Sequence, residues 1–259
     1  MPRIGSYADM ESTWKLYPLA NEAGEQIGAG DILVSQENEI PSPHAIYIGQ
    51  PAHLTVPTHY HDNAQFQIFV EGGATLGRRN LRPVTVHFAT HQTGYGPLVS
   101  GPQGLTYITL RLVTEFGAHY PDRPEERARM NPAIPRRQIT QEVGSIGHGE
   151  LQELKEPQVI PALGPEPGGL AAWVVRLAPG ATLPAPAHPG GAGQFCTVTA
   201  GSLVVDGRQC ERHAVVWVGP EEEHFSLCAG TDGAEVVVCQ FPRDALCRAG
   251  DFGASKPLQ

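Results

Sequence analysis

The sequence has no long apolar run. No stretch of its 259 residues approaches the roughly 18 apolar residues that a membrane-spanning helix needs. Residues 1–24 also lack the apolar core of a secretory signal peptide and contain acidic residues early. We therefore expect a cytoplasmic protein that is not embedded in a membrane.

Positive charge is scarce. Lys and Arg total 18 against 27 Asp and Glu, which gives a formal net charge of −9. No basic stripe or basic–aromatic pattern offsets this charge, so phosphate backbones and anionic lipid surfaces would be repelled. We expect neither nucleic acid nor a membrane among the partners.

Cysteine is absent from the first half of the chain. Five cysteines lie in the second half and include no C-x-x-C pair: Cys196, Cys210, Cys228, Cys239 and Cys247. An odd number without an export signal favours free thiols in a reducing compartment. We interpret them as buried, unreactive thiols.

Several common signatures are also missing. The sequence has no Gly-rich phosphate loop before a helix, no G-x-S-x-G elbow and no H-E-x-x-H helix. Helical signals are nearly absent. The one clear candidate is a short charged helix within residues 121–130, PDRPEERARM.

Turns and short β-prone runs make up most of the sequence. It contains 30 Gly and 24 Pro, scattered between apolar runs rather than gathered in one tract. Runs rich in Val, Thr and aromatic residues that end in a turn are typical of strands. They include VTVHFA, LTYITLRLV, AAWVVRLA, HAVVWVG and AEVVVCQF. The pattern predicts an all-β protein, long enough for two domains.

The chain contains an internal repeat. Residues 54–73 (LTVPTHYHDNAQFQIFVEGG) and 183–202 (LPAPAHPGGAGQFCTVTAGS) align at a constant offset of 129 positions. The identities in this register include Pro57 with Pro186, His59 with His188, Gln65 with Gln194, Phe66 with Phe195 and Gly72 with Gly201. Duplication of one domain is the simplest explanation.

The first copy resembles the cupin superfamily. The first motif of that family reads His-x-His, a carboxylate after three or four residues, and Gly after six more. His59, His61 and Gly72 keep this spacing, and Gln65 stands where the carboxylate belongs. The resemblance implies a bicupin, two tandem jelly-roll β-barrels. We expect an arm (1–29), a first barrel with the metal site (30–117), a connector with a short helix (118–168), and a second barrel with a C-terminal tail (169–259).

The His-x-His pair predicts a metal site in the first barrel. Residues i and i+2 of a strand point to one face, so His59 and His61 would enter the same interior. Gln65 would complete three donors and leave open positions for substrate. Its neutral amide predicts weaker affinity than a carboxylate. The alternatives are that the histidines only form hydrogen bonds in the barrel, and that Gln65 orients a histidine or a substrate.

The second cupin motif normally supplies one more histidine. His224 occupies that place in the second half, and the offset of 129 places Tyr95 there in the first. Tyr95 could bind the metal or transfer a proton, because a phenol beside a cation loses its proton more easily; it could also be a buried tyrosine with a satisfied hydroxyl. His91, or His87, could replace the missing ligand.

The second barrel keeps only part of the motif. It has His188, Gln194 and His224, but Gly190 replaces the second histidine of the pair. We therefore interpret it as mainly structural, supporting the first barrel or a dimer interface.

Arg111 lies within the apolar run LTYITLRLV. A buried arginine usually has a carboxylate or phosphate partner. If its side chain points into the barrel, Arg111 would bind a small anionic substrate, whereas an outward side chain would be an ordinary surface charge.

Similarity to cupins implies a divalent transition metal, iron first, with manganese, nickel or zinc as alternatives. The leading hypothesis is an iron-dependent dioxygenase acting on a small organic substrate. A redox-neutral lyase or isomerase in the same pocket and a non-catalytic binding protein are the alternatives. We also expect a homodimer, because jelly-roll sheet edges often join across two chains.

Overall fold

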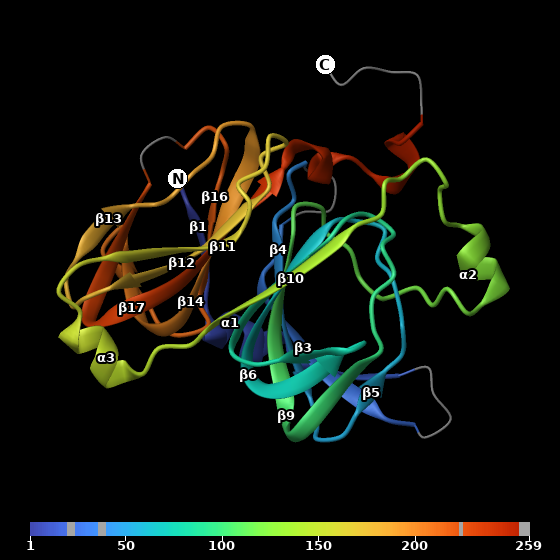
Figure 1. Ribbon diagram of the computed structural model, residues 1–259, viewed down its shortest axis with the longest axis horizontal. Coiled ribbons are helices and arrows are strands. Elements are labelled where there is room, and N and C mark those ends of the chain that lie inside the picture. The colour runs from blue at the N-terminus through green and yellow to red at the C-terminus, as the bar shows by residue number, and fades with distance from the viewer. Residues whose placement is uncertain (20–23, 36–39, 223–224, 254–259) are drawn as a thin grey trace.

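Two antiparallel β-sheets hold most of the chain. The computed structural model describes residues 1–19, 24–35, 40–222 and 225–253. The two β-rich units lie side by side, the first in blue to green and the second mainly in yellow to red (Figure 1). The all-β prediction is confirmed.

The first sheet has nine strands in the described chain. Their order is β10 (Gln138–Gly144), β8 (Val84–Ala89), β6 (Gln65–Leu76), β9 (Leu98–Arg111), β4 (His44–Gln50), β3 (Gln26–Leu33) and β2 (Lys15–Pro18). The short strands β5 (Thr55–Val56) and β7 (Arg79–Leu81) pair with β9 and β6.

The second sheet has eight described strands. Their order is β1 (Arg3–Gly5), β16 (Val215–Val218), β14 (Gly191–Val205), β17 (Ser226–Pro242), β12 (Ala171–Leu177) and β11 (Gln158–Leu163). The short strands β13 (Thr182–Pro184) and β15 (Arg208–Cys210) pair with β17 and β14.

Helices are few and short. They are α1 (Tyr7–Thr13), α2 (Pro124–Ala128), α3 (His148–Glu153) and the 3-10 turns η1 (Arg243–Leu246) and η2 (Ala249–Asp251). Only α2 lies where the sequence predicted a helix. The sequence analysis missed α1, although Ser6 and Asp9 form a capping box that is visible as a Ser-x-x-Asp signal. No helix of the described chain is long and apolar enough to cross a membrane.

Each sheet recruits a strand from outside its expected boundaries. Strand β1, in the segment predicted as an arm, pairs with β16 of the second sheet. Strand β10, in the segment predicted as a connector, pairs with β8 of the first sheet, and β11 pairs with β12 of the second. Covering an exposed sheet edge satisfies its backbone hydrogen bonds, which explains why these polar segments form strands.

The predicted duplication is visible in the strand register. Gln65 faces Arg111 across β6 and β9. Gln194 faces Gln240 across β14 and β17, with both residues 129 positions further along the chain. The repeat therefore extends beyond the segment in which the sequence revealed it.

Aromatic side chains from both barrels form one shared core. Phe241 packs edge-on against Phe66 at a centroid distance of 4.8 Å, and Phe195 lies 5.8 Å from Phe241. Because strand residues alternate, Phe66 faces this shared core while Gln65 and Gln67 face the interior of the first barrel.

The interiors of the two barrels differ. The second is filled with apolar side chains, among them Val175, Val198, Val216 and Val238. Buried polar side chains occur in both barrels, among them Gln194 and Gln240 in the second, but the first gathers two histidines and an arginine. A ligand site is therefore expected in the first barrel.

The five cysteines are free, as predicted. Cys196, Cys210 and Cys239 are buried, whereas Cys228 and Cys247 are only partly so. Burial raises the pKa of Cys196 to about 12, which keeps this thiol protonated and unreactive.

Replacement of Phe241 tests the shared core. We expect Phe241→Ala to lower the free energy of unfolding by about 3–5 kcal/mol, because the cavity lies where both barrels pack. Urea denaturation measures this change. Val34→Ala, at a 53 % exposed position, should change stability by no more than about 0.5 kcal/mol. Equal effects of the two variants would contradict a shared core.

Candidate ligand site in the first barrel

His59 and His61 come together in the first barrel. They lie in an extended segment between β5 and β6, where His59 bridges to Tyr95 and Tyr60 bridges to His119 on the opposite side. Their side chains are buried, with ring centroids 5.4 Å apart. The side chains of His59 and His61 therefore point to the same side, as expected for a strand, although this segment is not a continuous strand.

A chain of hydrogen bonds crosses the site and runs through the Tyr95 hydroxyl. Arg111 donates from Nε and Nη2 to Gln65 Oε1, at 3.0 and 2.8 Å. Gln65 Nε2 donates to the Tyr95 hydroxyl at 2.5 Å. That hydroxyl lies 3.1 Å from His59 Nε2, and His59 Nδ1 lies 2.8 Å from the Pro57 carbonyl oxygen. Because a carbonyl only accepts, Nδ1 carries the proton of His59, and Nε2 accepts from Tyr95.

Arg111 points into the barrel and is almost fully buried. It also donates from Nη2 to His61 Nδ1 at 3.0 Å and from Nη1 to the Glu115 carbonyl oxygen at 2.7 Å. His61 Nδ1 also lies 3.5 Å from Glu115 Oε1, but the contact with Arg111 is shorter. Since guanidinium only donates, we assign Nδ1 as its acceptor and place the proton of His61 on Nε2. His59 and His61 are therefore opposite tautomers.

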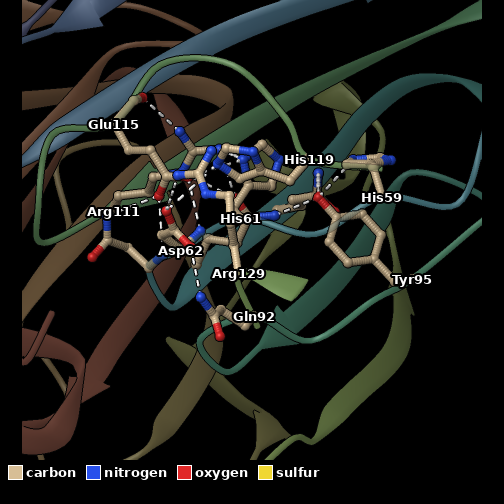
Figure 2. Close-up of polar contacts among 12 residues, drawn as sticks. His59, His61, Asp62, Gln92, Tyr95, Arg111, Glu115, His119 and Arg129 are labelled. Atoms are coloured by element: carbon tan, nitrogen blue, oxygen red, sulfur yellow. Dashed lines mark hydrogen bonds and ion pairs between the residues drawn. The ribbon is translucent and has the colours of Figure 1, made fainter. Parts of the chain in front are cut away.

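Glu115 supplies a negative charge near the positive charge of Arg111. Its carboxylate accepts the backbone N–H groups of Asp62 and Asn63 at 2.8 and 3.0 Å. Burial acts to raise the pKa of Glu115, but contact with His61 and the charge of Arg111 hold it well below its usual range. Arg111 and Glu115 therefore place opposite charges beside His61 (Figure 2).

Both histidines are neutral. Burial lowers the pKa of His59 to about 4, and burial together with Arg111 lowers that of His61 to about 3. Burial also raises the pKa of Tyr95 far above its ordinary value. Desolvation of the phenolate outweighs the attraction of Arg111 at Tyr95. The roles of Tyr95 as a metal ligand and in proton transfer stay predictions.

These side chains border a cavity of about 330 Å³. Its wall includes His59, His61, Gln67, Thr109 and Arg111, and its mouth includes residues of β2 and of the segment 116–120. The volume suits a small organic molecule.

Solved structures with similar folds cover nearly the whole chain. A provisionally assigned dioxygenase from Nostoc punctiforme matches with a TM-score of 0.58 and 11% identity over 100% of this chain and 84% of its own. Bacterial pirin YhhW from Escherichia coli, in complex with nickel(II), matches with a TM-score of 0.51 and 13% identity, covering 93% of this chain and 99% of its own. Oxalate decarboxylase from Lactobacillus farciminis, in a formate complex, matches with a TM-score of 0.56 and 11% identity, covering 92% of this chain and 86% of its own.

The chain has the bicupin fold. No family model matches its sequence, and no curated protein matches it either. At these identities the solved structures establish the fold of this bicupin, and its chemistry has to be argued from its own residues.

The first-barrel residues of the bicupin do not fit a resident metal as they are arranged. The Gln65 amide oxygen, which would be a ligand, accepts two hydrogen bonds from Arg111. His61 carries its proton on Nε2, the nitrogen that would need a free electron pair for an ion in the cavity. Tyr95 is a neutral phenol. The donor set has no anion, and a permanent cation touches two of its members, so an ion would meet repulsion there.

Another group of possible metal ligands lies nearby. Among the described residues, Asp62, Glu115 and His119 are the three that place His, Cys, Asp or Glu donor atoms within 4.8 Å of one another. Both Glu115 oxygens already accept N–H groups, and Asp62 accepts from Gln92 at 2.8 Å. Sequence spacing gave no signal for this group because its members lie far apart in the chain.

His91 does not reach the site, contrary to the prediction that it is a ligand. Its Nε2 lies 2.9 Å from the Cys247 carbonyl oxygen and its ring contacts Phe252. The chain turns after β8, which directs His91 to the C-terminal segment. His87 does face the interior, with its ring 5.2 Å from that of Tyr95, and its Nδ1 contacts Thr140 Oγ1 at 2.8 Å.

In the second barrel the corresponding residues bind one another. Gln194 Nε2 donates to the Pro186 carbonyl at 2.8 Å and to Gln240 Oε1 at 3.1 Å. Gln240 also accepts the backbone N–H of His188. His224 lies outside the described residues. Gln240 occupies the position of Arg111, so this barrel has no cation there, which supports a structural role.

Removal of the Tyr95 hydroxyl tests the hydrogen-bond network of the site. We expect Tyr95→Phe to lower the free energy of unfolding by about 1–3 kcal/mol, because Gln65 and His59 would each lose a buried partner. Tyr120→Phe is the matched control, since its hydroxyl makes none of these bonds. Chemical denaturation of both variants measures the difference, and a Tyr95→Phe protein as stable as the parent would contradict the network.

Proposed function

We propose that the first barrel of this bicupin binds a small organic acid through Arg111 and His61, without a resident metal ion. The observation that carries the proposal is the hydrogen bond from Arg111 to His61 Nδ1. This bond places the proton of His61 on Nε2. The protonated Nε2 cannot bind a metal and can instead donate a hydrogen bond. His61 and Arg111 both line the cavity.

The remaining donors favour an anion. Arg111 has five N–H groups, of which four have partners in Gln65, His61 and Glu115. One N–H on Nη1 and the His61 Nε2–H are available to a carboxylate, and charge-assisted hydrogen bonds of this kind are strong. Asp31 in the same wall accepts a hydrogen bond from His44 Nε2 at 2.9 Å, and burial lowers the pKa of His44, so this contact orients Asp31 without adding a cation.

The iron-dependent dioxygenase predicted from the sequence is the second candidate. One observation favours it: the Pro57 carbonyl fixes the His59 tautomer so that Nε2 has the free electron pair, as a metal-binding histidine requires. This function requires Arg111 to release His61 and Gln65. A lyase or isomerase that uses manganese, nickel or zinc has the same requirement.

Metal content separates the two candidates. Protein purified without a metal-affinity tag should contain far less than one equivalent of iron, manganese, nickel or zinc, because the candidate ligands are neutral and Arg111 already binds Gln65 and His61. Elemental analysis measures this. One equivalent of metal in the parent protein, lost in the His59→Ala, His61→Ala double variant, would establish the metal-dependent candidate instead.

Binding of short carboxylic acids tests the proposal directly. By calorimetry, Arg111→Gln should weaken binding of linear monocarboxylates at least about tenfold, since a charge-assisted bond is lost. The matched control is Arg176→Gln, which removes a partly buried arginine paired with Glu235 in the second barrel. Both variants lose stability, but only Arg111→Gln should lose affinity. Equal affinities in the two variants would refute the proposed anchor.

The homodimer and the cytoplasmic location stay predictions, as does the absence of nucleic-acid and membrane partners.

A further inference from the structure

The cavity wall contains buried polar atoms without a partner. Among the described residues, Gln67 Oε1 and Thr109 Oγ1 have no hydrogen-bond partner although both are fully buried atoms. Gln67 is 3 % exposed and Thr109 is 1 % exposed, and both line the same cavity as Arg111. A buried polar atom without a partner is destabilising, so such atoms need an explanation.

The two residues are neighbours in the sheet. Gln67 on β6 and Thr109 on β9 are direct cross-strand partners. Gln67 Nε2 is directed to the Tyr95 hydroxyl at 3.4 Å, which leaves Oε1 as a free acceptor. Thr109 can donate or accept. Together they form a site for one neutral group that also donates and accepts.

This pair lies one step along the sheet from the proposed carboxylate anchor. Gln65 and Arg111 are the next partners in the same register, two residues from Gln67 and Thr109 on each strand. Two residues of a strand span about 6.6–6.8 Å. A ligand that reaches both would carry its two polar groups at about that separation.

We propose that the ligand of the first barrel is a linear acid of about five carbons with a hydroxyl or carboxamide at the end opposite the carboxylate, bound by Gln67 and Thr109. This inference rests on the proposed function, which supplies the carboxylate end. The hydroxyl donates to Gln67 Oε1 and accepts from Thr109.

Three acids test the inference by calorimetry: 5-hydroxypentanoate, 2-hydroxypentanoate and pentanoate. The parent protein should bind 5-hydroxypentanoate at least about tenfold more tightly than pentanoate, because the site rejects an analogue that leaves its polar atoms without a partner. The 2-hydroxy isomer should bind no better than pentanoate, since its hydroxyl lies at the wrong distance.

Thr109→Val provides the decisive variant. It should reduce the preference for 5-hydroxypentanoate over pentanoate at least about threefold, because the ligand hydroxyl then keeps only its bond to Gln67 Oε1, and the unliganded variant should be at least as stable as the parent because an unpaired polar atom is removed. Thr85→Val is the matched control: Thr85 is a buried barrel threonine whose Oγ1 donates to the Arg82 carbonyl at 2.6 Å. It should lose stability and keep the preference for the hydroxy acid.

The outcomes distinguish failure of the inference about Gln67 and Thr109 from failure of the proposed acid-binding function. If all three acids bind equally in the parent and depend on Arg111, the inference about Gln67 and Thr109 is wrong and the acid-binding function stands. If Thr109→Val keeps the full preference of the parent, the hydroxyl does not contact Thr109 and the inference is also wrong. If none of the acids binds, both the inference and the proposed function fail.

Discussion

The buried Arg111 guanidinium is the interaction on which the candidate site depends. A permanent cation inside a barrel requires acceptors, and Gln65, His61 and the Glu115 carbonyl provide them. Each acceptor is thereby fixed in one orientation. Gln65 must turn its amide nitrogen to Tyr95, and His61 must carry its proton on Nε2. The properties of the site follow from this one charge.

Duplication explains why only one barrel has such a site. Both barrels keep the same register, but Gln240 replaces Arg111 and apolar side chains fill the second interior. In the first barrel, two polar atoms without partners, Gln67 Oε1 and Thr109 Oγ1, belong to residues that line the same cavity as Arg111. The shared core around Phe241 joins the two, so the packed barrel also stabilises the one that has the cavity.

Sequence patterns predicted the structural features that depend on local periodicity. The offset between His59 and His188 and the strand-forming runs identified two similar barrels, and the His-x-His spacing placed two imidazoles together. The direction of the Arg111 side chain and the reach of the Tyr95 hydroxyl depend on distant strands, so local pattern left them open. The edge pairing of β1 and β10 depends likewise on tertiary contacts. Glu115 carried no motif at all, because its role comes from charge alone.

The tautomer of His61 tests the central claim most directly. Nitrogen-15 NMR of the histidine side chains at neutral pH reports which ring nitrogen carries the proton in each imidazole. We predict two neutral rings with opposite tautomers, the proton on Nδ1 in His59 and on Nε2 in His61. A proton on Nδ1 of His61 would contradict the account, because that nitrogen could not then accept from Arg111 and Nε2 would be free to bind a metal.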